Sequence, residues 1–341
     1  MDDHQPDTTI SGSARRRGCL LGLAVGDAFG APVEFWRRDE IVERFPPDGI
    51  TTLEPWHGLP AGTFTDDTQM SIATARGVLD WRAAGGRPDA ASAADVAALT
   101  DAIWDRYLEW YQSHDWEGRA PGDTCMSALA GGRPGRTDDP ARNGSKGCGG
   151  VMRVAPLGLI GLGDRAFDAA ARAAALTHGH VTSDLSSGFL ALLVDRLVAG
   201  FGLAEAAGVA RERLVAQPGC EETLAAVDAA VASARSDEGP YAAIGRIGSH
   251  GVERPDGRGK GWVAEEALGI GLFCALRFGH DYPAAVRAAA TITGDSDSTA
   301  SIAGAILGAR FGLEVVPADW AAQAERRDEL LALADELGSG D

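Results

Sequence analysis

The run GCLLGLAVGDAFGAPVE, residues 18–34, places a glycine at every fourth position of an apolar stretch. These glycines fall at positions 18, 22, 26 and 30, and a second row with the same period stands at 304, 308 and 312. Residues four apart share one face of a helix, and each glycine in a helix interior costs about 1 kcal/mol relative to alanine. We therefore predict two central helices that pack closely through their glycine faces. A Gly- and Ala-rich composition is the alternative origin of such rows.

Helical patterning dominates the rest of the chain. Apolar residues recur at spacings of three and four along Ala-rich segments, whereas β-branched runs are few and short. We expect an all-α fold with a disordered N-terminal segment at 1–14 and one domain at 15–337. The expected helices are 68–81, 93–111, 164–177, 184–200, 203–216, 222–235, 262–278, 282–292, 299–312 and 318–337, with loops at 83–92, 131–147 and 236–261.

Two short acidic motifs lie about 230 residues apart, TDDT at 65–68 and GDSDST at 294–299. Each joins two aspartates to hydroxyl side chains directly before a helical run. One such motif alone is equally consistent with a helix N-cap. Four aspartates brought together would repel one another unless a divalent cation neutralised them, so the pair favours a metal site that both motifs build.

Oxygen-only ligation favours Mg²⁺ or Mn²⁺, because neither motif has the nearby His or Cys that zinc prefers. The second motif does not fit an EF-hand. Counting from Asp295, Ala300 and Ile306 stand where that loop requires Gly and Glu. The first motif does not fit the DDxxD pattern of isoprenoid synthases, because Met70 occupies the last position.

Three further features carry weaker signals. The Gly-rich run NGSKGCGG at 143–150 could expose backbone N–H groups to phosphate, but Gly147 follows Lys146 and excludes a Walker A motif. An ordinary flexible loop is the alternative. In the run THGH at 177–180, the two histidines do not share a helix face, so a capping or core role is open for His178. Glu34, taken alone, resembles a surface acid.

Charge and composition narrow the function classes. The 341-residue chain has a formal net charge of −18, which argues against general affinity for nucleic acid or anionic membranes. Its five cysteines show no CxxC spacing, which favours a reduced cytoplasm. Asp27 interrupts the first apolar run, so we interpret that run as a core helix and not as a signal peptide. No apolar run approaches the roughly 20 residues of a membrane span. We expect a cytoplasmic monomer.

Taken together, these segments resemble the ADP-ribosylglycohydrolase family, which includes dinitrogenase reductase-activating glycohydrolases, ADP-ribosylarginine hydrolases and J1 crystallins. Five stretches carry the resemblance, in order and spacing, over roughly residues 15 to 315: the run from Gly18 to Glu34, the TDDT motif, the Gly-rich loop through Met152 and Arg153, Leu176 to His178, and the GDSDS motif. The resemblance implies a compact, single-domain orthogonal helical bundle with a dinuclear metal cleft.

The resemblance also implies roles for individual residues. Two Mg²⁺ or Mn²⁺ ions would be held by Thr65, Asp66, Asp67, Asp295, Asp297 and Ser298. Glu34 would act beside the metals as a catalytic acid, and we assign Asp67 as a second catalytic group. The phosphates and adenosine of ADP-ribose would be held by Gly144, Ser145, Lys146, Gly147, Cys148, Gly149 and His178.

The chain departs from the family pattern at three positions. Ser298 replaces a frequent Thr and keeps the hydroxyl, while Lys146 and Cys148 stand where some members carry an aromatic residue and Asn. A further acid that some members use after the TDD helix matches either Asp115 or Asp123. The predicted activity is removal of ADP-ribose from a modified target by cleavage at ribose C1″. A non-catalytic ADP-ribose binder, a crystallin-like structural protein, and a hydrolase of a free ADP-ribose derivative or a modified nucleobase are the alternatives.

Overall fold

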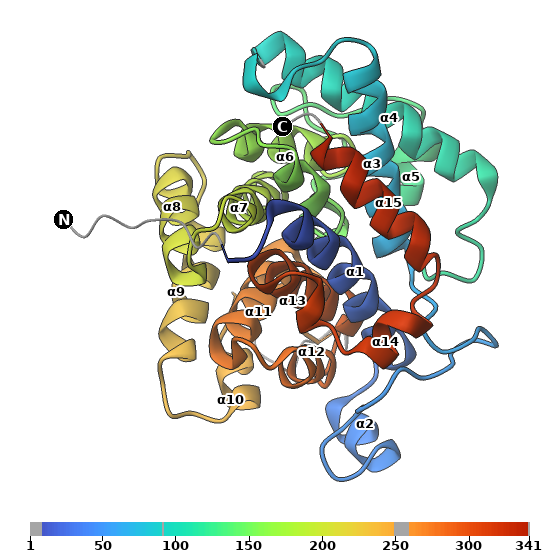
Figure 1. The fold of residues 1–341 in the computed structure, drawn as a ribbon, viewed down its shortest axis with the longest axis vertical. Helices are drawn as coiled ribbons and strands as arrows, with labels where there is room; N and C mark the ends of the chain where they lie inside the picture. Colours follow the sequence, from blue (N-terminus) through green and yellow to red (C-terminus); the bar gives the residue numbers. More distant parts are fainter. Residues whose placement is uncertain (1–8, 91, 249–258, 340–341) are drawn as a thin grey trace.

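The structure is a computed structural model that describes residues 9–90, 92–248 and 259–339. Within these ranges the chain forms α-helices and short 3-10 turns and no β-strand, which confirms the predicted all-α fold (Figure 1). The two ends of the described chain meet, because α1 (Gly12–Gly30) packs against α15 (Arg327–Gly338). An ion pair between Arg17 Nε and Asp335 Oδ1, 2.7 Å apart, joins these two helices.

The centre of the molecule is the pair formed by α1 and α13 (Ser296–Phe311), as the two glycine rows predict. The helices approach so closely that a Cβ atom on Gly304 would lie 2.1 Å from the carbonyl oxygen of Gly22. A Cβ atom on Gly308 would lie 1.9 Å from the carbonyl oxygen of Gly18. Both distances are far below van der Waals contact, so the glycine rows are a packing requirement of this interface.

We expect Gly304→Ala to lower the free energy of unfolding by about 1–3 kcal/mol, because the new methyl group would force the two central backbones apart. Gly208→Ala is the matched control. Gly208 lies inside α8 (Leu203–Val215), and a Cβ atom there would meet nothing within 4 Å. That control should stabilise the protein by about 0.5–1 kcal/mol through helix propensity alone. Urea unfolding of both variants tests the packing, and equal stabilisation of the two would refute it.

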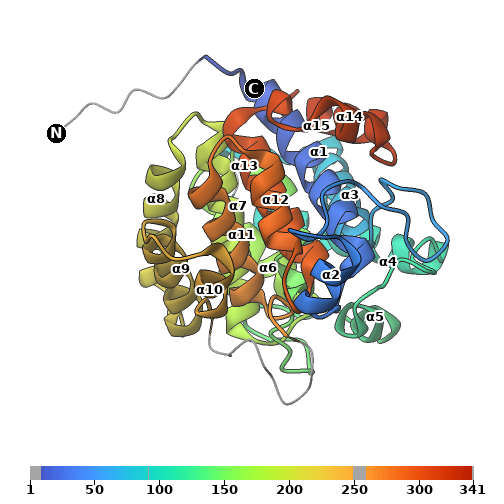
Figure 2. The same cartoon turned by 90° about the horizontal axis from the view of Figure 1, so that it is seen from below.

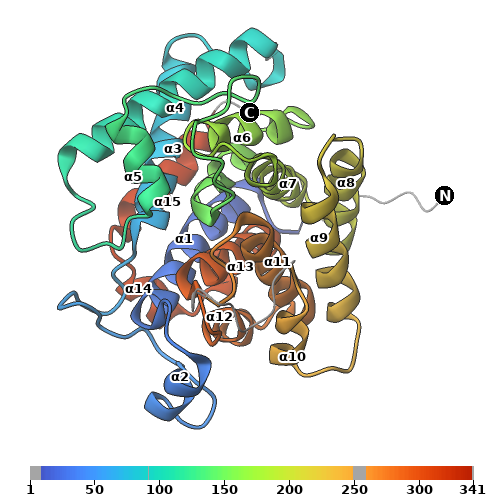
Figure 3. The same cartoon turned by 180° about the vertical axis from the view of Figure 1, so that it is seen from behind.

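Other helices pack around the central pair. α11 (Ala264–Phe278), α12 (Tyr282–Ala290) and α7 (Val181–Val198) lie against α13. Figures 2 and 3 show two outer groups on opposite sides of this core. One group consists of α8, α9 (Glu221–Ala234) and α10 (Pro240–Gly245), and the other of α3 (Asp66–Ala83), α4 (Ala93–Ser113) and α5 (Asp123–Ala130). α6 (Arg165–Ala175) packs between α7 and α4.

The sequence pattern missed three short helices and joined two others. α2 (Arg38–Arg44), α5 and α10 contain 7, 8 and 6 residues, too few to show a clear apolar period. The helix expected at 318–337 is two helices, α14 (Ala318–Gln323) and α15. The break covers residues 324–326: Ala324 leaves the helical region with a ψ of 126°, and Arg326, directly before α15, has a left-handed φ of 51°.

The N-terminal segment is shorter than expected. Residues 12–14 form the first turn of α1, because the Ser11 side chain caps the helix by accepting a hydrogen bond from Ala14 N at 3.1 Å. Residues 1–8 of the segment, for which we expect disorder, lie outside the described residues. Within the described ranges, no single helix has the length and apolar character to cross a membrane, although one pair bent by 92°, Gly12–Val33 with Arg38–Arg44, passes on length and composition.

Candidate active site

Three segments far apart in sequence converge on one cavity. Glu34 follows the 3-10 turn Ala31–Val33 at the end of α1, while the two acidic motifs form the first turns of α3 and α13. Both motifs also cap their helices. Thr65 Oγ1 accepts a hydrogen bond from Asp67 N, and Asp295 Oδ1 accepts one from Ser298 N. The capping interpretation is therefore correct, and the two capped helix starts also face one cavity.

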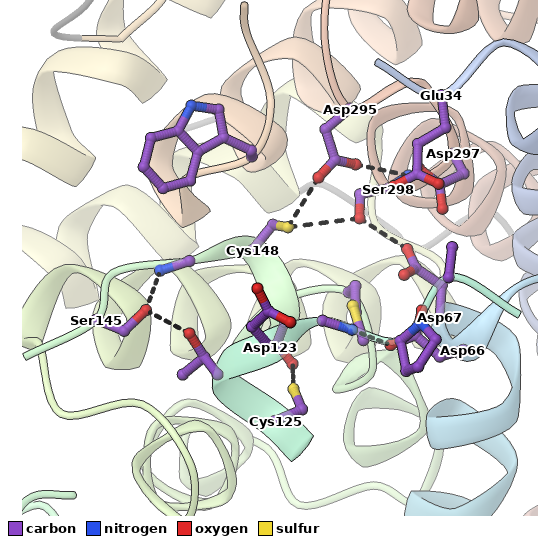
Figure 4. Close-up of a pocket in the computed structure, with 18 of the residues that line it drawn as sticks. Glu34, Asp66, Asp67, Asp123, Cys125, Ser145, Cys148, Asp295, Asp297 and Ser298 are labelled. Atoms are coloured by element: carbon purple, nitrogen blue, oxygen red, sulfur yellow. Dashed lines mark hydrogen bonds between the residues drawn. The ribbon is translucent and has the colours of Figure 1, made fainter. Parts of the chain in front are cut away.

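The cavity has a volume of about 420 Å³ and is the pocket drawn in Figure 4. Six carboxylates line it, and they come from the loop after α1, from α3, from α5 and from the start of α13. These are Glu34, Asp66, Asp67, Asp123, Asp295 and Asp297, and the other lining residues with predicted roles are Ser145, Gly147, Cys148, Gly149, His178 and Ser298. Thr65 is fully buried behind the cavity wall.

A hydrogen bond joins the two acidic motifs directly. Ser298 Oγ donates to Asp67 Oδ2 at 2.9 Å, across 231 positions of sequence. Asp297 is 3% exposed, and its Oδ1 has no hydrogen-bond partner. A buried carboxylate oxygen without a partner is costly, and a bound cation would remove that cost. By their chemistry, these oxygen donors therefore suit a cation such as Mg²⁺ or Mn²⁺.

The expected dinuclear centre nevertheless stays a prediction. In the described part of the chain, no group of three or more His, Cys, Asp or Glu side chains stands in an arrangement that could hold a metal ion. Instead the ligand candidates bond to one another, as Ser298 does with Asp67.

Burial raises the pKa values of Glu34, Asp66, Asp67 and Asp295 well above their usual range. For each of them, the negative charge of Asp297 is the next largest cause. Without a cation, the protonated forms of these carboxyl groups are therefore favoured. The closeness of the carboxylates that raises these pKa values would also favour a bound cation.

Asp27 organises the site from behind, a role that the sequence patterns did not assign. Its Oδ1 accepts a hydrogen bond from Thr65 N at 2.9 Å, and its Oδ2 accepts bonds from Thr68 N and Thr68 Oγ1 at 3.0 and 2.5 Å. The side chain is fully buried, and burial, followed by the charge of Asp297, raises its pKa to about 7. The sequence held one signal for this role, a single carboxylate within the apolar run of α1. A charge buried in such a run requires partners.

The Gly-rich loop contributes only part of its length to the cavity. Ser145 and 147–149 line it, whereas Gly144 and Lys146 do not. Lys146 Nζ points instead to Glu222 Oε2 and Glu265 Oε1, each at 2.8 Å. The lysine therefore ties the loop to α9 and α11, and its predicted contact with phosphate would require these two ion pairs to open.

His178 lies on the cavity wall, and its ring is held in one orientation. Arg153 Nη2 donates to Thr177 Oγ1 at 2.6 Å, and that hydroxyl lies 2.8 Å from His178 Nδ1. Since Thr177 accepts from Arg153, we assign its own proton to the bond with Nδ1, which places the ring proton on Nε2. Burial, followed by the charge of Arg153, lowers the pKa of His178 to about 3. His178 is thus a neutral hydrogen-bond donor.

The structure separates the two candidates for the further acid. Asp123, at the first turn of α5, lines the cavity, whereas Asp115 lies outside it, and the carbonyl oxygen of Asp115 accepts a hydrogen bond from Gln69 Nε2 at 2.9 Å. Phe35 and Trp262 also line the cavity, and neither stood out in the sequence. Phe35 is 46% exposed, which is unusual for a large apolar side chain and marks the cavity rim. The one signal in the sequence was its position directly after Glu34.

The ADP-ribosylglycohydrolase family profile matches residues 8–341. This chain belongs to the ADP-ribosylglycohydrolase family. It is 28% identical to the ADP-ribosyl-[dinitrogen reductase] glycohydrolase of Rhodospirillum rubrum, over 94% of this chain and 96% of that protein. It is 27% identical to the ADP-ribosylhydrolase ARH3 of Mus musculus, over 95% and 91% of the two chains.

A solved structure, titled ADP-ribosylglycohydrolase-related protein complex, superposes with a TM-score of 0.70 and 27% identity, covering 97% of this chain and 99% of that one. The family assignment therefore extends over nearly the whole chain. It confirms the resemblance that the five motifs indicated.

Proposed function

We propose that this ADP-ribosylglycohydrolase is a Mg²⁺- or Mn²⁺-dependent hydrolase that removes ADP-ribose from a modified target by cleaving the glycosidic bond at ribose C1″. One observation carries the proposal: Glu34 and five aspartates from distant segments line one cavity together with the Gly-rich loop and His178. The names of the bacterial and mouse relatives point to the same reaction class.

The proposed ligands of the two ions are Thr65, Asp66, Asp67, Asp295, Asp297 and Ser298. Bound there, the ions would supply Lewis acidity toward the ribose hydroxyls and a water molecule. The donor set is made of hard oxygen atoms. A bound cation would give the unpartnered Oδ1 of Asp297 a partner.

Glu34 is the proposed acid. Burial and the negative charge of Asp297 raise the pKa of Glu34, which favours the protonated form that a general acid requires. As the bond at C1″ breaks, the bonding electrons leave with the departing nitrogen or oxygen, and Glu34 gives that atom its proton. The transition state has oxocarbenium character, which the surrounding carboxylates stabilise. Asp67, which would be ionised as a ligand of the cations, would accept the proton that the attacking water loses.

The other end of the cavity suits the diphosphate. His178 would present a neutral Nε2–H donor, and Gly147 and Gly149 beside it carry no side chain. A Cβ atom on Gly149 would lie 2.9 Å from the His178 ring, so a side chain at this position would crowd the histidine. We propose that these groups hold the anionic part of ADP-ribose.

A substrate panel tests the proposed function. ADP-ribosyl-arginine, ADP-ribosyl-serine, ADP-ribosylated nucleic acid and O-acetyl-ADP-ribose are incubated with the protein and Mg²⁺ or Mn²⁺, and released ADP-ribose is measured. Release from at least one substrate is expected. If ADP-ribose binds in calorimetry but no substrate releases it, the protein is a binder and the enzymatic proposal is wrong.

We also expect Mg²⁺ to raise the melting temperature, and to raise it more at about pH 8 than at about pH 5. The folded-state pKa values of Glu34, Asp66, Asp67 and Asp295 are raised, so their stability contribution is full below the unfolded pKa near 4 and is lost as pH rises. A bound cation offsets this loss of stability only at pH values at which the carboxylates are ionised. Differential scanning fluorimetry at both pH values measures the effect, and a Mg²⁺ shift of the same size at each would contradict it.

A further inference from the structure

Cys148 brings a sulfur atom to the edge of the carboxylate cluster. Its Sγ lies 3.1 Å from Asp295 Oδ2 and 3.7 Å from Ser298 Oγ (Figure 4). The Ser298 hydroxyl in turn donates to Asp67 Oδ2. The thiol therefore touches two of the proposed metal ligands and is one hydrogen bond from a third. Because Cys148 lines the cavity, a solute that enters the cavity can reach this sulfur.

The backbone fixes the sulfur in this place. Cys148 N donates to the carbonyl oxygen of Trp262 at 3.0 Å, and an antiparallel bridge pairs Gly147 with Val263. The same short segment holds the second acidic motif, since Asp295 N donates to the carbonyl oxygen of Lys260 at 2.9 Å. Residues 260–263 thus connect the thiol-bearing loop to the aspartates, and this connection does not depend on side-chain positions.

An independent observation indicates that this cluster lacks a ligand. Asp297 is 3% exposed, lines the same cavity and leaves Oδ1 without a hydrogen-bond partner. Oxygen donors alone suit Mg²⁺ or Mn²⁺. A sulfur donor beside them changes the selectivity, because thiolate binds Zn²⁺, Cd²⁺ and Co²⁺ far better than it binds Mg²⁺.

We propose that Cys148 is a ligand for a thiophilic divalent cation such as Zn²⁺, so that Zn²⁺ competes with Mg²⁺ for this centre. The inference rests on the metal centre of the proposed function. On binding, the S–H bond breaks, a sulfur–zinc bond forms and the proton passes to water, with no change of oxidation state. Zn²⁺ then gains a contact that Mg²⁺ does not use, and replaces it at lower concentration.

Cobalt substitution tests this directly, because Co²⁺ takes zinc sites and a thiolate bonded to it gives a charge-transfer absorption in the near ultraviolet. The band is expected in the wild-type protein and should be lost in Cys148→Ser. Cys125→Ser is the matched control, since Cys125 lines the same cavity but faces Arg153, whose Nη1 lies 3.4 Å from its Sγ. The band should persist in that variant.

Competition calorimetry gives the second readout. Zn²⁺ affinity should fall by about tenfold or more in Cys148→Ser, whereas Mg²⁺ affinity should stay unchanged. Alkylation of the wild-type protein gives a test that does not require the variant to fold. Zn²⁺ should protect Cys148 from iodoacetamide, and Mg²⁺ should not.

The outcomes separate the two proposals. A wild-type protein with no cobalt–thiolate band, but with a Mg²⁺-dependent melting shift, would overturn the role of Cys148 and leave the metal centre standing. A band that survives in Cys148→Ser would also overturn that role. Absence of both the band and the melting shift would count against the metal centre of the proposed function itself.

Discussion

Asp297→Asn is expected to abolish most of the activity and, at the same time, to stabilise the protein without metal. The Asp297 charge raises the pKa of Glu34, Asp66, Asp67 and Asp295, so its removal relieves repulsion in the folded state. Each pKa unit of relief is worth about 1.4 kcal/mol at a pH where the carboxylates ionise. Loss of a ligand from the proposed centre should lower kcat/KM by about 10²-fold or more, since metal-ion catalysis contributes several kcal/mol.

Opposite changes in stability and activity distinguish this result from simple unfolding. The metal-free melting temperature at about pH 8 should rise, and the Mg²⁺-dependent shift should shrink. Asp138→Asn is the control, because Asp138 is an exposed acid away from the cavity and its substitution should change neither quantity. A variant that keeps wild-type turnover would show that the two motifs do not form one metal site.

The central fold was predictable because its signal is steric and periodic. Glycines at every fourth position of two segments indicated close backbone contact, and α1 and α13 make that contact. The short helices α2, α5 and α10 were not predictable, because fewer than three turns give no reliable period. The break between α14 and α15 was hidden for another reason: Arg326 is left-handed, a conformation that arginine does not signal.

In the cavity, too, some residues could be predicted from the sequence and others could not. Its acidic motifs stand out as short runs of aspartate and hydroxyl residues, so Asp66, Asp67, Asp295 and Asp297 could be named from the sequence alone. Asp123 could be named only as one of two candidates beside Asp115, because a single acid at a helix start is ordinary. The placement of Lys146 was also hidden. Its partners, Glu222 and Glu265, lie on helices that only the fold brings to the loop.

Glu34→Gln should retain the fold, metal affinity and ADP-ribose affinity, yet lose turnover by about 10²–10⁴-fold, the range for a removed proton-transfer group. Glutamine is neutral and has the shape of a protonated glutamate, the form that burial and the charge of Asp297 favour at Glu34 by raising its pKa. Binding should therefore remain unchanged while the proton for the leaving group is missing. Calorimetry with ADP-ribose and a release assay measure the two quantities separately.

Glu43→Gln provides the control for this test, because Glu43 is an exposed acid on α2, a few residues beyond Glu34. Its substitution should change neither binding nor turnover, since surface changes rarely exceed about 0.5 kcal/mol. Full turnover in Glu34→Gln would remove Glu34 from the mechanism while leaving the enzyme intact, and another acid of the cavity, such as Asp123, would then have to supply the proton. Weaker ADP-ribose binding in Glu34→Gln would instead assign Glu34 to holding the substrate, because a group that acts only on the proton leaves ground-state affinity unchanged.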